Sequence, residues 1–265
     1  MGKNHEEDLA LANRLADAAD TVTLTRYQSQ DLKITTKPDN TPVTDADKSA
    51  ENAIRALLHA DRPADGIVGE EFGDEGTERD RYWVIDPIDG TKNFMRGVPT
   101  WATLIALVEK GSDGGEEVVV GVVSAPALFR RWHARKGGGA FVTVNKQFTK
   151  QINVSAISDI ADASISYSDF IGWGPRLEKF QSLLSKAWRT RAHGDFWSHM
   201  LVAEGALEIA AEPSLALWDM AALDIIVREA GGSFTNLEGA VGSLGVSGLS
   251  TNAALHNYIV TELKL

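Results

Sequence analysis

The sequence predicts an α/β (α+β) protein in which two β-sheets are interleaved with helices. Two observations predict this fold class. The apolar runs at 101–110 and 116–126 are rich in Val and Ile, as is typical of buried strands. Beyond residue 160, short apolar segments alternate with segments of helical period, which favours strands covered by helices. The length of 265 residues suits one layered domain over 1–265, and a boundary near residues 150–160 would divide it into lobes 1–155 and 156–265.

The first half of the chain is expected to hold two helices and most of the strands. Leu9, Ala12, Leu15 and Ala16 recur at helical spacing. Thr44 precedes the second helix, and Thr44-x-x-Asp47 fits a capping box. The expected elements are a helix over 6–26, a turn-rich loop over 37–47, a helix from Thr44 to about His59, a short strand ending at Gly69, strands over 81–85, 101–110 and 116–126, and a hairpin over 128–144 with a triple-glycine turn.

In the second half, helices and strands are expected to alternate. Pro175 stands at a favoured first-turn position of a helix, and Gly231 is a common helix stop. The expected elements are a strand over 164–170, helices over 175–188 and 194–207, a strand over 208–212, a helix over 218–232 and a last helix over 253–265.

Composition excludes several classes of function. The chain has no cysteine, so it forms no disulfide framework, thiolate nucleophile or Cys-ligated zinc site. No apolar run approaches a membrane span, and residues 1–20 have no apolar signal segment. The formal net charge of −11 repels a nucleic-acid backbone on average. We therefore expect a cytoplasmic protein that binds neither nucleic acid nor membrane, and its acidity suits the binding of divalent cations.

The stretch YWVIDPIDGTKNF (82–94) carries the strongest chemical signal. Asp86 and Asp89 follow an apolar run, Pro87 stiffens the peptide between them, and Gly90 permits a tight turn. Two nearby carboxylates repel each other unless a cation lies between them, and carboxylate oxygens suit magnesium. Two alternatives compete with a metal site. A lone D-x-x-D is commonly a loop with an Asx-turn, and D-x-D-G-T is a phosphatase motif with a nucleophilic Asp, although the spacing here differs from it by one residue.

Three further acids are candidates, each with a structural alternative. Glu70 in VGEEF ends a short strand, where a surface loop acid is common. Asp219 in LALWDMAALD starts a helix, where the macrodipole favours an acid. Asp47 has the capping-box role given above.

In combination, PVTDAD, GEE, DPIDGTKNF and WDMAALDIIVREAGG resemble, in order and spacing, the inositol monophosphatase family of metal-dependent, lithium-sensitive phosphatases. The resemblance runs from about residue 8 to the C-terminus. It implies a layered αβαβα sandwich of the inositol monophosphatase/fructose-1,6-bisphosphatase type and a homodimer. It places the metal and phosphate site in the first lobe, and the substrate pocket with the last metal ligand in the second.

The resemblance also assigns roles to residues. It implies that two to three Mg²⁺ ions are held by Glu70, Asp86, the carbonyl of Ile88, Asp89 and Asp219. It implies that Asp47, Glu70 and Thr91 serve catalysis, with Asp47 and Thr91 orienting the attacking water, and that the N–H groups of Gly90 and Thr91 bind the phosphate. In such a site the metals activate water and stabilise the leaving oxygen, and the protein forms no covalent intermediate.

Two acids are candidates for the pocket that binds the leaving group. By the resemblance, Glu212, seven residues before Asp219, contacts the alcohol portion of the substrate. The His193-Gly194-Asp195 step, with aromatics after it, is similar to histidinol-phosphate phosphatases of the actinobacterial type within this family. Asp195 and Glu212 would favour a cationic amino alcohol electrostatically, although Asp195 also suits a helix N-cap.

The leading expectation is therefore hydrolysis of a small phosphate ester, L-histidinol phosphate, in histidine biosynthesis. The enzyme alternative is an inositol-1-phosphate or broad sugar-phosphate phosphatase. A regulator that binds RNA is the alternative from another class, and the net charge argues against it.

Overall fold

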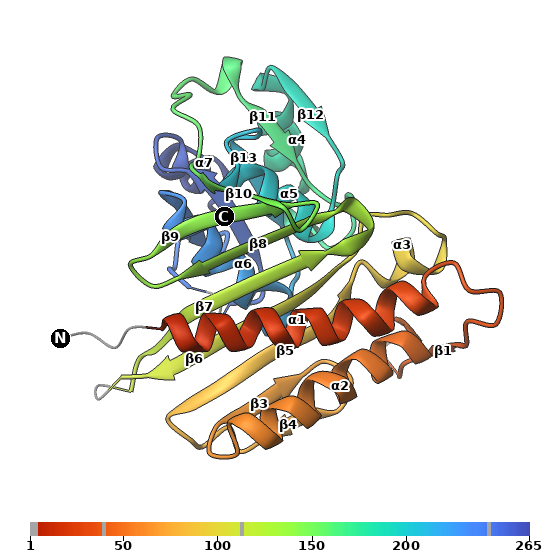
Figure 1. The fold of residues 1–265 in the computed structure, drawn as a ribbon. Coiled ribbons are helices and arrows are strands. Elements are labelled where there is room, and N and C mark those ends of the chain that lie inside the picture. Colours follow the sequence, from red (N-terminus) through yellow and green to blue (C-terminus); the bar gives the residue numbers. More distant parts are fainter. Residues whose placement is uncertain (1–4, 39–40, 112–113, 243–244) are drawn as a thin grey trace.

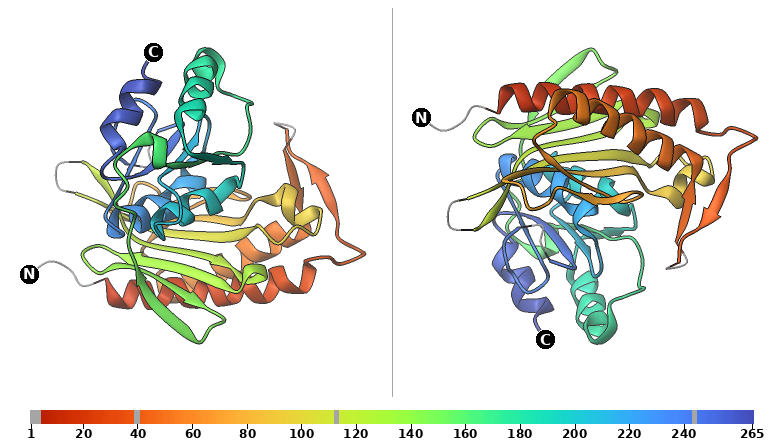
Figure 2. Two further views of the ribbon diagram at one scale, coloured as in Figure 1. Left: turned by 90° about the horizontal axis from the view of Figure 1, so that it is seen from above. Right: turned by 90° about the horizontal axis from the view of Figure 1, so that it is seen from below.

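The protein is described by a computed structural model that covers residues 5–38, 41–111, 114–242 and 245–265. Layers of helices and sheets alternate through it (Figures 1 and 2). Helices α1 (Glu6–Arg26) and α2 (Asp45–Asp61) cover one face of an eight-stranded sheet. Helices α5 (Asp195–Ala203) and α6 (Leu217–Glu229) lie between this sheet and a five-stranded sheet. Helices α4 (Leu177–Lys186) and α7 (His256–Leu263) cover the outer side of the second sheet. The predicted αβαβα sandwich is confirmed.

The eight-stranded sheet comes from the first half of the chain. Its order is β10 (Phe148–Ile152), β9 (Gly139–Val144), β8 (Arg130–Arg135), β7 (Glu116–Ala125), β6 (Ala102–Lys110), β5 (Arg81–Asp89), β3 (Gly66–Gly69) and β4 (Gly73–Glu75). Its central strands are apolar on both faces because helices cover both. In β5, Trp83 and Ile85 pack toward α1 and α2, and Tyr82 and Val84 pack toward α6.

The five-stranded sheet comes from the second half. Its order is β12 (Arg189–Arg191), β11 (Ser164–Ser166), β13 (Ile209–Glu212), β15 (Gly248–Asn252) and β14 (Gly232–Thr235). Strands β11 and β13 run parallel, so their carboxyl ends meet at the same edge of the sheet, where polar side chains gather. No helix in the described ranges combines the length and the apolarity needed to cross a bilayer.

Several expected boundaries were wrong. Part of the loop expected over 37–47 is a strand, β2 (Pro42–Thr44), which pairs with β1 (Ile34–Thr36), and residues 39–40 of that loop lie outside the described residues. Strand β5 continues to Asp89 rather than ending at Ile85, and β11 ends at Ser166 rather than residue 170. The helix expected over 175–188 begins at Leu177, after a short 3₁₀ turn over Gly174–Arg176.

Candidate active site

The acidic stretch of the sequence lies where strands β3 and β5 end. These strands are parallel and pair Gly69 with Ile85, so Glu70 and Asp86 emerge together at one edge of the sheet. The pairing of β5 with β6 shifts register between Asp86 and Asp89. Oδ1 of the buried Asp86 accepts the N–H of Ile88 at 2.9 Å. The irregular strand end therefore aims Asp86 and Asp89 toward one place instead of to opposite faces.

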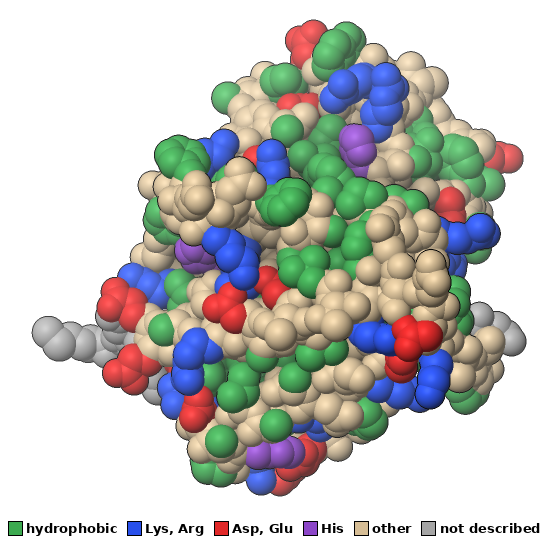
Figure 3. Space-filling model, turned by 45° about the vertical axis from the view of Figure 1, so that its right-hand side comes forward, with side chains coloured by type: hydrophobic (Ala, Val, Ile, Leu, Met, Phe, Trp, Pro, Cys, Tyr) green, Lys and Arg blue, Asp and Glu red, His purple; other side chains and the backbone are tan. Residues whose placement is uncertain are grey.

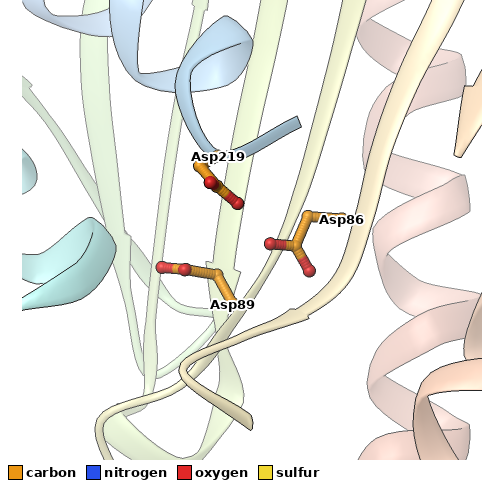
Figure 4. Close-up of side chains that lie close together, drawn as sticks. All are labelled: Asp86, Asp89 and Asp219. Atoms are coloured by element: carbon orange, nitrogen blue, oxygen red, sulfur yellow. The ribbon is translucent and has the colours of Figure 1, made fainter. Parts of the chain in front are cut away.

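Asp219 reaches this place from a different layer. It lies in the first turn of α6, where its Oδ2 accepts the N–H of Ala216 at 2.7 Å. Oxygen atoms of Asp86, Asp89 and Asp219 lie within 4.8 Å of one another (Figure 4). Residues separated by more than a hundred positions thus share one cluster of carboxylates.

The cluster is electrostatically unfavourable on its own. Burial, followed by the charges of Glu70, Asp89 and Asp219, raises the pKa of Asp86 well above its usual range. Burial, followed by the charges of Asp195 and Asp219, does the same to the pKa of Asp89. Burial raises the pKa of Asp219 to about 7. The Nζ atom of Lys37 lies 2.7 Å from Oε1 of Glu70, at the rim of the cluster. Oxygen donors held this close fit a hard divalent cation, which would compensate their charge.

Asp47 and Thr91 meet beside the carboxylate cluster. The Thr91 hydroxyl lies 3.3 Å from Oδ1 of Asp47 and 3.0 Å from the carbonyl oxygen of Ile88. Thr91 begins the short helix α3 (Thr91–Met95). Burial raises the pKa of Asp47 to about 6, against the opposing effect of hydrogen bonds from Thr44. A carboxylate with a pKa near neutrality is suited to accept a proton through the hydroxyl.

Gly90 lies in the turn between Asp89, which ends β5, and Thr91, which begins α3. Its φ of +84° is in the left-handed region that favours glycine. A Cβ at this position would lie 2.9 Å from the carbonyl oxygen of Thr100 and 3.3 Å from Oδ2 of Asp195. The position therefore requires glycine both for its backbone conformation and for the close approach of Thr100.

Asp195 and Glu212 form the far side of the site. Asp195 starts α5, and its Oδ2 accepts a hydrogen bond from the Asn93 amide at 3.0 Å. The N–H of Phe196 donates to Oδ2 of Asp89 at 2.7 Å, which ties the start of α5 to the carboxylate cluster. Glu212 ends β13 and is buried, and this burial raises its pKa to about 8.

One cavity of about 560 Å³ connects these groups. The predicted residues that line it are Glu70, Asp89, Gly90, Thr91, Asp195, Glu212 and Asp219. Asp86 adjoins it through the carboxylate cluster, and Asp47 and Ile88 adjoin it through Thr91. The structure thus brings all ten predicted site residues together.

Sequence reasoning missed several groups in and around the cavity. Lys37 lies in the loop expected over 37–47, and Asn93 lies inside DPIDGTKNF, but the sequence analysis assigns a role to neither. Ser168 and Asp169 also line the cavity. They follow β11, and no motif marks them, so their place becomes visible only from the edge that β11 shares with β13.

Comparisons with known proteins agree with this geometry. The sequence profile of the inositol monophosphatase family matches residues 4–264. A protein named histidinol-phosphatase from Mycobacterium tuberculosis is 53% identical, over 97% of this chain and 98% of that protein. Another of the same name from Streptomyces coelicolor is 53% identical, over 97% of each chain. A solved structure of an inositol monophosphatase from Zymomonas mobilis is 29% identical, covers 100% of both chains and superposes with a TM-score of 0.86.

Proposed function

Because this chain belongs to the inositol monophosphatase family of metal-dependent phosphatases, we propose that it hydrolyses L-histidinol phosphate to L-histidinol and phosphate in histidine biosynthesis. The observation that carries the substrate is the pair of acids Asp195 and Glu212, which both line the cavity and both contact the Ser168 hydroxyl, Asp195 through its N–H. Asp169 adds a third carboxylate to the residues that line the cavity, and Lys92 adds a cation. An ammonium and a protonated imidazole would meet complementary charge there, and two 53%-identical relatives carry the name histidinol-phosphatase.

The donor set supports magnesium as the cofactor, with two to three ions per site. Glu70, Asp86, Asp89 and Asp219, with the carbonyl of Ile88, would hold the ions. A bound divalent cation lowers the pKa of water and compensates the charge of a phosphate ester. Lys37 pairs with both Glu70 and Glu71 at 2.7 Å. It can therefore stay paired with Glu71 when Glu70 binds a metal ion.

The chain's own groups would act on water and phosphate. Thr91 and Asp47 would orient the attacking water, with the water's proton passing toward Oδ1 of Asp47 through the Thr91 hydroxyl. The N–H groups of Gly90 and Thr91 would bind the phosphate, because a glycine at position 90 lets the backbone approach it closely. Asp195 and Glu212 would bind the leaving group and take no part in the proton transfer.

We also propose a cytoplasmic homodimer, on the resemblance to the family. Size-exclusion chromatography with light scattering tests the homodimer, because a monomer would have a mass of 28.6 kDa and a dimer twice that mass.

The surface charge argues against nucleic-acid binding. On the face shown in Figure 3, Lys and Arg side chains are interspersed with Asp and Glu side chains. That mixture differs from the continuous basic stripe with which proteins bind nucleic acids.

The proposed substrate is tested by phosphate release from a panel of esters. We expect kcat/KM for L-histidinol phosphate to exceed that for inositol-1-phosphate by at least about a hundredfold. Inositol-1-phosphate is the second candidate, favoured by the fold shared with the Zymomonas mobilis enzyme. Equal kcat/KM values on the two esters would replace the histidinol assignment with a broad phosphatase.

A further inference from the structure

Ser168 connects the two acids on the leaving-group side of the cavity. Its hydroxyl donates to Oε1 of Glu212 at 2.8 Å and accepts the N–H of Asp195 at 3.1 Å. Strands β11 and β13 are parallel neighbours, so the loop after β11 lies beside the end of β13, where Glu212 is placed. The start of α5 comes to the same point. One hydroxyl therefore uses its donor for one acid and an acceptor lone pair for the backbone of the other.

The contact with Glu212 decides how that carboxylate is held. Glu212 is 5% exposed, so few solvent molecules reach it. Both the hydroxyl and the backbone N–H of Ser168 oppose the rise in the pKa of Glu212 that burial causes. Without Ser168, the buried side chain would lose a donor that favours its ionised form. The form of Glu212 that attracts a cation thus depends on Ser168.

The contact with Asp195 holds an unusual turn. Asp195 has a φ of +49°, and Gly194 before it has a φ of +73°. A Cβ on Gly194 would lie 3.2 Å from the Ser168 hydroxyl oxygen. Left-handed backbone at a residue other than glycine persists only where its surroundings hold it. The Ser168 hydroxyl, which binds the N–H of Asp195, is one such support.

This turn sets the direction of the Asp195 side chain. From it, Oδ2 of Asp195 reaches the Asn93 amide at 3.0 Å, next to the expected phosphate turn. The following N–H, that of Phe196, donates to Asp89. Ser168 thus lies between Glu212 on one side and the Asp195 turn on the other.

We propose that Ser168 is a positioning residue that holds Glu212 and Asp195 together as one subsite for a cationic leaving group. This inference rests on the proposed function and adds the element that makes two separate acids act jointly. Ser168 takes no part in phosphoryl transfer. Its effect is therefore confined to the binding of cationic esters, and esters with a neutral leaving group depend little on it.

The test compares Ser168→Ala and Ser168→Thr with the parent enzyme, on L-histidinol phosphate and on inositol-1-phosphate with saturating magnesium. We expect Ser168→Ala to raise KM for L-histidinol phosphate by about tenfold or more, because a hydrogen bond to a charged group is lost. We expect kcat to change by less than about threefold, since binding of the phosphate is untouched. Ser168→Thr keeps a hydroxyl and should recover most of the loss.

The matched control is Ser185→Ala, which removes an exposed hydroxyl on α4 that donates to the carbonyl of Ser182. In this variant, KM and kcat for both esters should equal those of the parent enzyme. A second readout is the pH profile of kcat/KM for L-histidinol phosphate. Its acid limb should move to higher pH in Ser168→Ala, because the pKa of Glu212 rises further. A role in folding alone would not move that limb.

The outcomes separate the two proposals. A parent enzyme that prefers L-histidinol phosphate, with equal loss on both esters in Ser168→Ala or no loss at all, overturns the role of Ser168 only. A parent enzyme without that preference overturns the proposed function, and this inference with it. Should Ser168→Ala fail to fold, Ser168→Cys decides, since a thiol is a weak donor and is expected to give an intermediate KM.

Discussion

The Thr91 hydroxyl lies 3.3 Å from Oδ1 of Asp47, so helices α3 and α2 meet at a single carboxylate. Oδ2 of that carboxylate accepts the N–H of Thr44 at 2.9 Å and the Thr44 hydroxyl at 2.5 Å. The sequence left a choice between a capping role and a catalytic role for Asp47. The two roles use different oxygens, so the geometry accommodates both.

We therefore predict that Asp47→Asn separates activity from stability. The amide oxygen can keep the cap, but the side chain no longer accepts a proton, so kcat should fall by at least about a hundredfold. Thr44→Ala is the matched control, because it removes the cap hydroxyl and costs about 1 kcal/mol of unfolding free energy. It should retain most of kcat. Steady-state kinetics and thermal melts of both variants check this, and a kcat loss of the same size in Thr44→Ala would argue against a catalytic Asp47.

Removal of divalent cations is expected to abolish turnover and to lower the melting temperature. The described cluster brings three carboxylates together. Their negative charges repel one another, and a bound cation would relieve this repulsion. Ligand binding to the native state at a hundred times its dissociation constant stabilises it by about 2.7 kcal/mol. The measurement is a melt and a phosphate assay in chelator, followed by titration with magnesium. Full turnover after exhaustive chelation would eliminate the metal mechanism.

Asp89→Asn is predicted to abolish activity and to stabilise the cation-free protein. The substitution removes one charge from a cluster in which each buried carboxylate disfavours the others, and the amide oxygen can still accept the N–H of Phe196. In chelator the variant should melt a few degrees above the parent. In magnesium this order should reverse, because the parent gains more from the ion. Near-normal turnover at modest magnesium would show that Asp89 is no ligand.

The parts of this site that sequence analysis predicted are those encoded locally. The helical spacing of Leu9, Ala12 and Leu15 predicts α1, and Thr44-x-x-Asp47 predicts the start of α2. The contact between Asn93 and Asp195 joins residues 102 positions apart, and no local pattern encodes it. Ser168 likewise meets Glu212 only because β11 and β13 are neighbours in the second sheet. Sheet order, which sequence periodicity does not specify, decides these contacts.

Glu212→Gln should change how stability depends on pH. Burial raises the pKa of Glu212 from the usual 4.5 to about 8, so the native state binds its proton more tightly than the unfolded state. The stabilising contribution is full below pH 4.5 and is lost as pH rises toward 8. In chelator, the melting temperature of the variant minus that of the parent should increase as the pH rises from 5 to 9. Glu178→Gln, an exposed site on α4, is the control and should show no such gain.

The last prediction concerns substrate choice, which the phosphate grip cannot make because every phosphomonoester shares it. Glu212→Gln keeps the size of the side chain and its oxygen for Ser168, and it removes the charge that would face a cationic leaving group. A charge-assisted contact contributes about 1.5–3 kcal/mol, so kcat/KM for L-histidinol phosphate should fall by roughly ten- to a hundredfold. The same substitution should cost inositol-1-phosphate less than about threefold, since its hydroxyls can bond an amide as well as a carboxylate. Parallel assays of the two esters, with parent and variant at about pH 9, where Glu212 with its pKa of about 8 is ionised in the parent, and with saturating magnesium, give the ratio directly. If Glu212→Gln lowers kcat/KM for both esters by the same factor, Glu212 acts by shaping the cavity. The proposal that its charge selects a cationic leaving group is then wrong.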